Sequence, residues 1–431
     1  MITLSDLSED QLNAYNSIIE WGRYNRSSKP VLVLGGYAGT GKSSVLGVFA
    51  RESGIDPIAF CAYTGKAASV LRRKLLDGGV QTRSRVIRTS KDEGPDEYYE
   101  TGTFIGRPYC GTIHGLIYMP VIDDKTGKIK GWEKRQELDV SYKLIVIDEG
   151  SMVNDEMLSD LRNYGVQILL VGDHGQLPPV SGMGSLMQYP DIRLEKIHRQ
   201  AEGNPIIQLS AQIRKTGQLN KSLQDDEHVR FEPIQRLKWL LKKRYQNSCT
   251  LFDKIVLVYT NKRRAGINQA IRETMDLRGA PTVNEQVICL RNQRDINVYN
   301  GMRGLITRDQ GRSTIWPWQL QAEIDFVEDS IKANVTMCAQ QFGRERTFDD
   351  YVDVETALFE TTGKRFTVSN WKAAGGLYDF GYALTVHKSQ GSGFDDVWVV
   401  AERPGIVDND GWKRWLYTSV TRSIRKVTIF S

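Results

Sequence analysis

The chain has 431 residues, of which 40% are hydrophobic and 25% are charged, with a formal net charge of +5. This length and composition are typical of a globular protein of two to four domains, and the mild positive charge permits a nucleic-acid partner without requiring one. No apolar run is long enough to cross a bilayer, and the polar, acidic segment Met1–Gln11 has no apolar signal sequence. We therefore expect a cytoplasmic protein with no membrane partner.

The cysteines are dispersed, and none forms a C-x-x-C pair. An odd number of scattered thiols indicates reduced cysteines in an intracellular protein rather than a disulfide framework or a zinc site. The five are Cys61, Cys110, Cys249, Cys289 and Cys338.

Short runs of apolar, mostly β-branched residues recur along the chain and predict buried strands of parallel sheets. Helical patterns lie between many of them, for example at Gly41–Arg51 and Gly65–Leu76, and this alternation is typical of α/β layers. Because four runs fall in the N-terminal half and four after Lys254, two α/β domains are the simplest prediction. The runs are Val31–Leu34, Ile58–Ala62, Leu144–Ile147, Ile168–Val171, Ile255–Val258, Ala383–Val386, Val397–Val400 and Val427–Phe430.

Three segments interrupt this alternation. Arg83–Tyr109 is rich in turn residues and gives no assignment. Tyr118–Lys134 has two short strand-like pieces around a polar turn, which predicts a hairpin. Leu305–Gly376 is rich in Thr, Val, Phe and charged residues with little helical period, and it predicts a small β domain inserted in the second α/β domain.

A phosphate-binding sequence follows the first predicted strand. It reads G-x-x-x-x-G-K-S from Gly36 to Ser43 and leads into a helical pattern. Glycines let backbone N–H groups turn toward a phosphate chain, and the helix N-terminus adds positive potential. Lys42 is expected to reach the β- and γ-phosphates of ATP, and Ser43 to bind Mg²⁺. A glycine-rich turn with an incidental lysine is the alternative, and the flanking strand and helix argue against it. The expected nucleotide-binding residues are Gly36, Gly39, Thr40, Gly41, Lys42, Ser43 and Ser44.

Two carboxylates follow the strand Leu144–Ile147 directly, at Asp148 and Glu149. Asp148 is expected to hold Mg²⁺ and Glu149 to polarise the attacking water. Alone, the pair could be an ordinary acidic turn; beside a phosphate-binding sequence it favours ATP hydrolysis.

Further polar segments follow in a fixed order, and together they resemble the superfamily 1 helicases. Within that superfamily they are similar to the 1B branch of RecD-like and phage Dda-like enzymes. The resemblance spans nearly the whole chain, and the combination of G-D-x-x-Q-L-P-P-V with L-Y-T-x-V-T-R is specific. The segments are Ala62–Ala68, Thr112–His114, Val171–Val180, Leu194–Arg199, Thr385–Gly391 and Trp415–Arg422.

The resemblance implies an α/β fold of two RecA-like P-loop domains with an inserted β-hairpin and a small inserted, SH3-like β domain. The expected limits are 1–195 for the first RecA-like domain, with the hairpin at about 117–138. The second RecA-like domain is expected at 196–304 and 377–431, and the inserted β domain at 305–376.

The resemblance also implies nucleotide contacts outside the phosphate loop. Gln11 resembles the family's adenine-reading glutamine, although a surface glutamine is the alternative. Gln176 resembles the γ-phosphate sensor, and Arg199 and Arg422 resemble arginine fingers that neutralise charge on the transferring phosphoryl group. Either arginine could instead be a solvated surface charge. Gly391 is expected in the nucleotide-binding set.

Other motif residues are expected to line a channel for single-stranded DNA through phosphate contacts. A buried structural role is the alternative for His114. Trp132 on the predicted hairpin is expected to stack on the last base pair at a fork, although packing against its own domain is the alternative. The channel residues are Thr64, Lys66, Thr112, His114, Thr385, His387 and Lys388.

The function expected from the resemblance is ATP-dependent, 5′-to-3′ translocation on single-stranded DNA with unwinding of duplex DNA. ATP and Mg²⁺ are the expected cofactors, single-stranded and fork DNA the expected partners, and replication or recombination proteins further partners. We expect a monomer in the cytoplasm of a bacterial or phage-infected cell. Three alternatives stay open: a P-loop switch protein, a motor subunit of a nuclease complex, and an RNA substrate.

Overall fold

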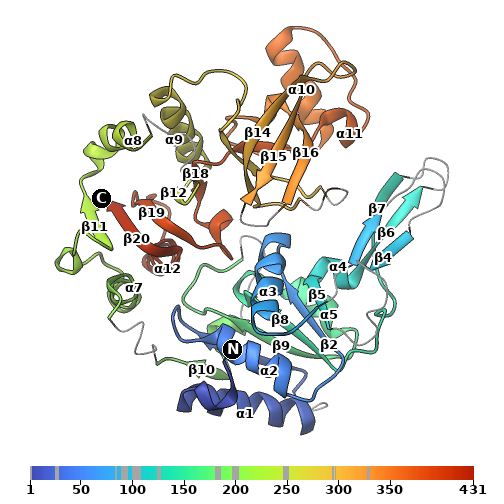
Figure 1. Cartoon of the computed structure of the whole chain (residues 1–431), viewed down its shortest axis with the longest axis vertical. Coiled ribbons are helices and arrows are strands. Elements are labelled where there is room, and N and C mark those ends of the chain that lie inside the picture. The colour runs from blue at the N-terminus through green and yellow to red at the C-terminus, as the bar shows by residue number, and fades with distance from the viewer. Residues whose placement is uncertain are drawn as a thin grey trace. The chain divides into compact units, whose positions relative to one another are not determined.

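The computed structural model describes residues 2–24, 29–82, 85–88, 96–99, 108–123, 128–179, 186–196, 203–245, 252–293, 296, 298–327 and 331–431. The chain forms two compact units, unit 1 at Met1–Gln208 and unit 2 at Leu209–Ser431 (Figure 1). The boundary falls within helix α7 (Pro205–Thr216). Among the described helices, none is both long and apolar enough to cross a bilayer.

Unit 1 is built on a six-stranded parallel sheet with the strand order β10-β1-β9-β8-β2-β5. All four apolar runs predicted in the N-terminal half lie in this sheet, so their assignment as parallel strands is confirmed. The strands are β1 (Val31–Gly36), β2 (Ile58–Ala62), β5 (Tyr109–Thr112), β8 (Leu144–Asp148), β9 (Gln167–Gly172) and β10 (Ile192–Leu194).

Helices cover both faces of this sheet, because its strands carry apolar residues on both sides. In β1, Leu32 and Leu34 belong to one core, which also holds Phe49, whereas Val31 and Val33 belong to the other. Each such burial contributes roughly 1.5–3 kcal/mol to folding. The helices are α1 (Glu9–Tyr24), α2 (Lys42–Glu52), α3 (Gly65–Asp77), α4 (Ile113–Ile117) and α5 (Asp155–Arg162).

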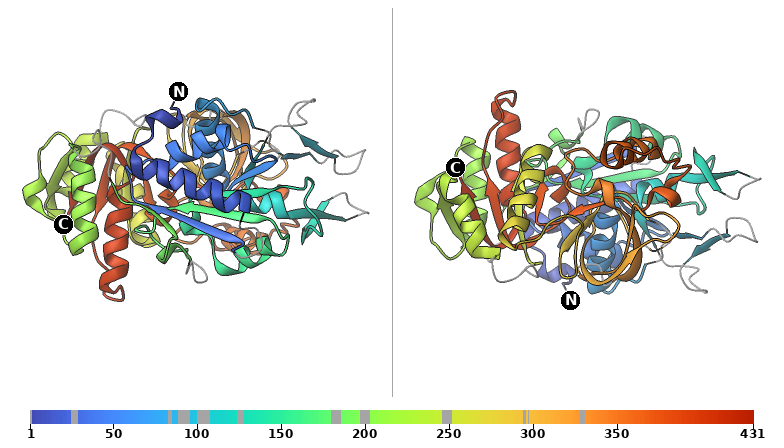
Figure 2. Two further views of the ribbon diagram at one scale, coloured as in Figure 1. Left: turned by 90° about the horizontal axis from the view of Figure 1, so that it is seen from below. Right: turned by 90° about the horizontal axis from the view of Figure 1, so that it is seen from above.

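Two antiparallel ribbons project from the same end of unit 1 as separate prongs (Figure 2). The first pairs β3 (Arg85–Arg88) with β4 (Asp96–Tyr99), in the segment that the sequence left unassigned. The second pairs β6 (Tyr118–Asp123) with β7 (Lys128–Lys134), which confirms the predicted hairpin.

The base of the β6–β7 hairpin is fastened to helix α5 through Asp160. Its carboxylate accepts hydrogen bonds from the Tyr118 hydroxyl (2.7 Å) and from the Lys134 ammonium (2.8 Å). The hydrogen bond to Asp160 raises the pKa of Tyr118 to about 12, and the Lys134 contact lowers the pKa of Asp160. The hairpin therefore stands on a fixed base.

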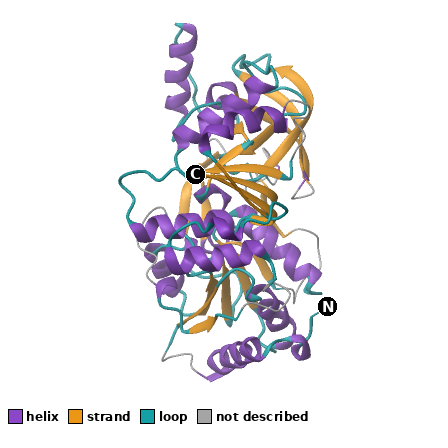
Figure 3. Cartoon of the chain, turned by 90° about the vertical axis from the view of Figure 1, so that its left-hand side faces the viewer, coloured by secondary structure: helices purple, strands orange, loops and turns teal. Residues whose placement is uncertain are grey.

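Unit 2 contains a second parallel sheet, in the order β11-β20-β19-β12-β18. The four apolar runs predicted after Lys254 all form strands of this sheet. The strands are β11 (Val229–Glu232), β12 (Lys254–Val258), β18 (Ala383–Thr385), β19 (Phe394–Val400) and β20 (Ser423–Phe430). Helices pack against the strands of both parallel sheets (Figure 3); those of unit 2 are α8 (Leu237–Tyr245), α9 (Asn261–Thr274) and α12 (Asn409–Val420).

A five-stranded antiparallel sheet completes unit 2, in the order β16-β15-β14-β13-β17. It extends beyond the predicted segment 305–376, because its strands β13 and β17 lie on either side of that segment. The same segment also contains two helices, α10 and α11. Its SH3-like character and the domain limits stay predictions. The bounds are β13 (Gln286–Cys289), β14 (Arg303–Arg312), β15 (Gln319–Phe326), β16 (Ile331–Cys338), α10 (Tyr351–Thr362), α11 (Trp371–Ala374) and β17 (Tyr378–Phe380).

Candidate nucleotide and nucleic-acid site

The phosphate loop joins the end of β1 to the start of α2. Gly39 and Gly41 have φ angles of 81° and 80°, a left-handed conformation that glycine adopts without strain. A Cβ atom at Gly36 would lie only 2.7 Å from Thr40 Oγ1, so the loop closes too tightly there for a side chain. Helix α2 begins at Lys42, and its first turn carries Ser43 and Ser44. The predicted strand, glycine loop and helix therefore follow in the expected order.

Hydrogen bonds within the loop hold it in shape. Lys42 Nζ donates to the carbonyl oxygens of Gly36 (2.6 Å) and Tyr37 (3.0 Å), and the buried Thr40 hydroxyl donates to Tyr37 O (2.8 Å). Both contacts of Lys42 are to backbone oxygens, so its ammonium can move to phosphate oxygens without breaking an ion pair.

Gln11 is fully buried, so its interpretation as a surface glutamine is wrong. Its amide nitrogen donates to Thr40 O (3.1 Å), and its amide oxygen accepts from the Ser8 N–H (3.0 Å). The side chain therefore supports the phosphate loop directly.

The expected carboxylates stand at the carboxyl end of β8. Asp148 is 9% exposed, and its carboxylate accepts a hydrogen bond from the Glu149 N–H (3.0 Å). Glu149 has a φ of 55°, a left-handed conformation that is uncommon for a residue with a side chain. An unexpected third group joins them: Lys74 Nζ, from α3, lies 3.1 Å from Ser43 Oγ and 4.0 Å from Asp148 Oδ2.

The segment after β9 carries the expected sensor. Gln176 is 5% exposed and donates to the buried Asp173 carboxylate (3.4 Å), which also accepts from the Gly175 N–H (2.9 Å). The neighbouring His174 ring packs on Tyr37 of the phosphate loop, with a ring separation of 4.1 Å. The segment Asp173–Gln176 and the phosphate loop are therefore in direct contact.

The expected DNA-contacting residues of unit 1 follow strands at the same edge of the sheet. In the register of the sheet, Ala62 of β2 lies beside both Thr112 of β5 and Asp148 of β8. Thr64 and Thr112 are the N-caps of α3 and α4, where their hydroxyls accept backbone N–H groups at 3.1 and 3.0 Å. The two threonines therefore lie at the ends of adjacent strands, at the same sheet edge as Asp148.

Two other expected DNA contacts of unit 1 differ in exposure. His114 is exposed and stacks on Tyr118 with a ring separation of 5.5 Å, so the alternative of a buried structural histidine is wrong. Lys66, in the first turn of α3, is only 6% exposed. Of the two, His114 has the more accessible side chain.

In unit 2, Thr385 ends β18, and His387 and Lys388 lie in the short turn that follows. Burial lowers the pKa of His387, so the imidazole is neutral at pH 7. Burial, aided by the nearby Arg264 guanidinium, lowers the pKa of Lys388 to about 8, against an opposing effect of Asp379. The pKa of Lys388 therefore lies closer to neutrality than that of an exposed lysine.

Arg422 is 6% exposed, so its interpretation as a solvated surface charge is wrong. Its guanidinium donates to Thr418 O (3.3 Å) and to Ser392 O (3.2 Å), which fixes its direction at the start of β20. Gly391, with a φ of 73°, forms the turn immediately before Ser392. The guanidinium of Arg422 is therefore buried in unit 2 and held in place by hydrogen bonds to two carbonyl oxygens.

Two expected site residues lie wholly or partly outside the described residues. Arg199 lies outside the described residues. The backbone of Trp132 pairs with Pro120 in the hairpin, and its side chain lies outside those described. Their roles stay predictions.

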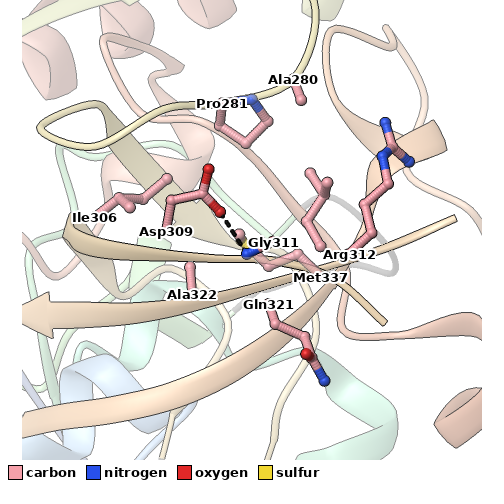
Figure 4. A pocket seen from close by; sticks show the side chains of 10 residues that line it. Ala280, Pro281, Ile306, Asp309, Gly311, Arg312, Gln321, Ala322 and Met337 are labelled. Carbon is pink, nitrogen blue, oxygen red and sulfur yellow. Dashed lines mark hydrogen bonds between the residues drawn. The ribbon is translucent and has the colours of Figure 1, made fainter. Parts of the chain in front are cut away.

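Two pockets of unit 2 are lined by residues other than Thr385, His387, Lys388 and Arg422. One, of about 160 Å³, opens on the antiparallel sheet, where Asp309 accepts the Gly311 N–H at 2.8 Å beside Met337 and Pro281 (Figure 4). Another, of about 750 Å³, lies between the end of α7 and the start of α12. The first is too small for a nucleotide.

Lys74 and the Tyr37–His174 contact were missed from the sequence. Lys74 belongs to a run of basic residues on α3, and a run of this kind is usually a solvated face. Only the packing of α3 beside α2 places one of these lysines at Ser43. For Tyr37, the available signal was its position inside the phosphate loop.

Two family models match the chain. An AAA domain matches residues 6–232, which is more than half of the chain. A UvrD-like helicase C-terminal domain matches residues 380–430. The matches cover the phosphate site of unit 1 and the Thr385–Arg422 motifs of unit 2.

Known proteins similar to this chain include a RecD2 DNA helicase and a RecD subunit. The ATP-dependent RecD2 DNA helicase of Deinococcus radiodurans is 25% identical over 97% of the chain, which spans only 48% of that relative. The RecD subunit of the RecBCD enzyme of Mycobacterium tuberculosis is 24% identical over 93% of this chain and 67% of its own. The fold is that of the Bacteroides Pif1 helicase solved with ADP-AlF3 and single-stranded DNA (TM-score 0.55, 19% identity, 99% of this chain and 92% of that one). The chain belongs to the AAA-domain family, whose model matches residues 6–232, and it is similar to RecD2 and RecD proteins over most of its length.

Proposed function

We propose that this chain is an ATP-dependent DNA helicase that moves 5′ to 3′ along single-stranded DNA and unwinds duplex DNA. One observation carries the proposal: at one edge of the unit 1 sheet, Asp148 and Thr112 lie on either side of Ala62 of β2, so the expected metal ligand and an expected DNA contact share that edge. The family, and the names of the similar RecD2 and RecD proteins, support this activity.

The nucleotide roles follow from the geometry of unit 1. The phosphate loop binds the phosphates of ATP through its backbone N–H groups and Lys42. Ser43 and Asp148 hold Mg²⁺, which offsets the negative charge of the phosphates. Their fit to a cation is supported by the Lys74 ammonium, which approaches oxygens of both residues. Glu149 orients the attacking water.

Gln176 senses the γ-phosphate from the segment that contacts the phosphate loop through His174 and Tyr37. Gln11 reads adenine while supporting Thr40, and Gly391 lies in the nucleotide-binding turn of unit 2. Arg199 and Arg422 are the arginine fingers.

The DNA roles follow from the strand edges. Thr64, Thr112 and His114 of unit 1 contact the strand, as do Thr385, His387 and Lys388 of unit 2, with Lys66 completing the expected set. The β6–β7 hairpin, with Trp132, splits the duplex at a fork. Contacts of this kind go to phosphates and sugars, so no sequence preference is expected.

The test combines hydrolysis with strand displacement. Lys42→Ala should abolish DNA-stimulated ATP turnover, Glu149→Gln should bind ATP without hydrolysing it, and Lys143→Met, an exposed lysine before β8, should behave as the unmodified protein. The unmodified protein should open a 5′-tailed duplex and leave a 3′-tailed duplex closed. Turnover that does not respond to DNA would instead indicate a switch ATPase, and stimulation by RNA alone an RNA motor.

A further inference from the structure

Lys74 brings a positive charge to the place where two expected Mg²⁺ ligands meet. Its ammonium donates a hydrogen bond to Ser43 Oγ (3.1 Å) and lies 4.0 Å from Asp148 Oδ2. Ser43 and the Lys74 side chain are exposed to solvent, the latter by 44%, whereas the Asp148 side chain is only 13% exposed. The lysine thus approaches a mostly buried carboxylate from the solvent side.

The helix that carries Lys74 is fixed, whereas the side chain is free to move. Leu71 and Leu75 of α3 are each 2% exposed and belong to the core of unit 1. A lysine side chain has four rotatable carbons, and its ammonium can turn to another partner at little cost. Moving the charge away therefore needs no movement of α3.

We propose that the Lys74 ammonium stands in for the metal ion in the nucleotide-free protein and that Mg²⁺ has to displace it. This inference rests on the proposed nucleotide site of unit 1. Mg²⁺ binds oxygen ligands at about 2.0–2.1 Å and needs the Ser43 lone pair that now accepts from Lys74. Both cations cannot use the same two oxygens, because each would repel the other at close range.

Two consequences follow from the displacement. Without metal, Lys74 offsets the charge of Asp148 and keeps the phosphate site neutralised. When Mg²⁺ arrives with the nucleotide, the competing ammonium raises the concentration of free Mg²⁺ that the site requires. Lys74 is therefore a positioning residue that sets the metal requirement and takes no part in the reaction itself.

The test is a titration of free Mg²⁺ at a fixed concentration of a fluorescent ADP analogue, with binding followed by fluorescence anisotropy. Lys74→Met should lower the half-saturating Mg²⁺ concentration about three- to tenfold, as expected for removing a near-surface charge beside a divalent ion. Lys74→Arg keeps the charge and should stay close to the unmodified protein. Lys143→Met removes one exposed charge from the same unit and should leave the titration unchanged.

The outcomes separate this inference from the proposed function. If the unmodified protein binds the analogue and Lys74→Met shows the same Mg²⁺ dependence, the inference is overturned while the nucleotide site stands. If the unmodified protein binds no nucleotide at saturating Mg²⁺, the proposed function itself fails. Should Lys74→Met not fold, as judged by circular dichroism, Lys74→Gln and Lys74→Arg decide the question by the same titration.

Discussion

Lys42 and Lys74 of the phosphate site in unit 1 are more exposed than the buried cations of unit 2, although Lys66 of unit 1 is itself only 6% exposed. In unit 1, the Lys74 side chain is 44% exposed, and half-buried Lys42 is held by backbone carbonyls alone. In unit 2, Arg422 and Arg264 are 6% and 4% exposed, and burial lowers the pKa of Lys388 to about 8.

This contrast separates adaptable charges from fixed ones. An exposed ammonium loses little hydration and can change partner when a ligand arrives. A buried guanidinium has given up its hydration and must keep hydrogen-bond partners, as Arg422 does with two carbonyls and Arg264 with Asp379. We infer that unit 1 adjusts to the nucleotide, whereas unit 2 presents charges whose directions are already set.

The largest expected effect tests the fixed charge at Arg422. Arg422→Ala should lower DNA-stimulated ATP turnover about 10³- to 10⁵-fold, because arginine fingers contribute on this scale. Nucleotide binding, measured by anisotropy, should fall much less. Arg425→Ala is the matched control, since Arg425 lies in β20, directly after the turn that holds Arg422, with a side chain that is 77% exposed. Normal turnover in Arg422→Ala would show that this arginine only supports the fold.

A second effect concerns the buried ion pair between Arg264 and Asp379, whose side chains are 5% and 0% exposed. Arg264→Met should lower the free energy of unfolding by about 3–5 kcal/mol, because it leaves a carboxylate buried without its cation. In the exposed pair Arg346–Asp349, Arg346→Met should leave the free energy of unfolding close to that of the unmodified protein. Urea unfolding followed by tryptophan fluorescence measures the free energy of unfolding of both variants. An equal loss in the two would contradict the contrast between buried and exposed cations.

A third effect distinguishes the binding of a single strand by unit 1 from the unwinding of a duplex. Trp132→Ala should slow unwinding about tenfold, because stacking on a base contributes roughly 1–3 kcal/mol. ATP turnover stimulated by single-stranded DNA should stay near normal. Trp239→Ala, at a tryptophan of unit 2 that is 55% exposed, is the aromatic control. If unwinding and turnover fall together, Trp132 supports the hairpin; if neither falls, the splitting element lies elsewhere.

The smallest effect is a pH dependence at Lys388. With a pKa of about 8, this lysine is mostly charged at pH 7 and mostly neutral at pH 9. A DNA phosphate favours the charged form, so binding above pH 8 takes up a proton and affinity falls as pH rises, by at most tenfold per pH unit. Anisotropy of a labelled oligonucleotide at constant ionic strength measures this. Lys388→Met should flatten the profile and exposed Lys364→Met should not; a profile that Lys388→Met leaves unchanged would exclude this contact.

The parallel sheets could be predicted because their signal is local. Strands such as β8 and β9 are buried on both faces and appear in the sequence as continuous apolar runs. The phosphate loop was equally readable, since its glycines and Lys42 are adjacent in the chain.

The antiparallel sheet was only partly predictable, because the short strand β13 lies outside the predicted segment 305–376 but pairs with β14, and β17 in turn pairs with β13. Helix α10 was missed because apolar residues lie on more than one side: Val354 and Leu358 are buried, whereas Val352 and Phe359 are about half exposed. No single apolar face marks such a helix. The Lys74 contact depends on how α2 and α3 pack, which no local pattern records.

The register of β2 has a mechanical consequence. Ala62 lies between Thr112 and Asp148, so the residue that is to touch the nucleic acid and the residue that is to hold the metal stand on strands separated by one other. Adjacent strands are about 4.8 Å apart, which makes this separation about 10 Å. The interior of a sheet is densely packed and therefore stiff. A displacement of Thr112 is passed to Asp148 through the hydrogen-bonded strand between them, and no hinge motion is needed. A DNA contact at Thr112 would then affect Asp148 across the single strand β2. A substitution that loosens the packing of β2 should reduce the stimulation of ATP turnover by DNA before it weakens the binding of DNA or of the nucleotide.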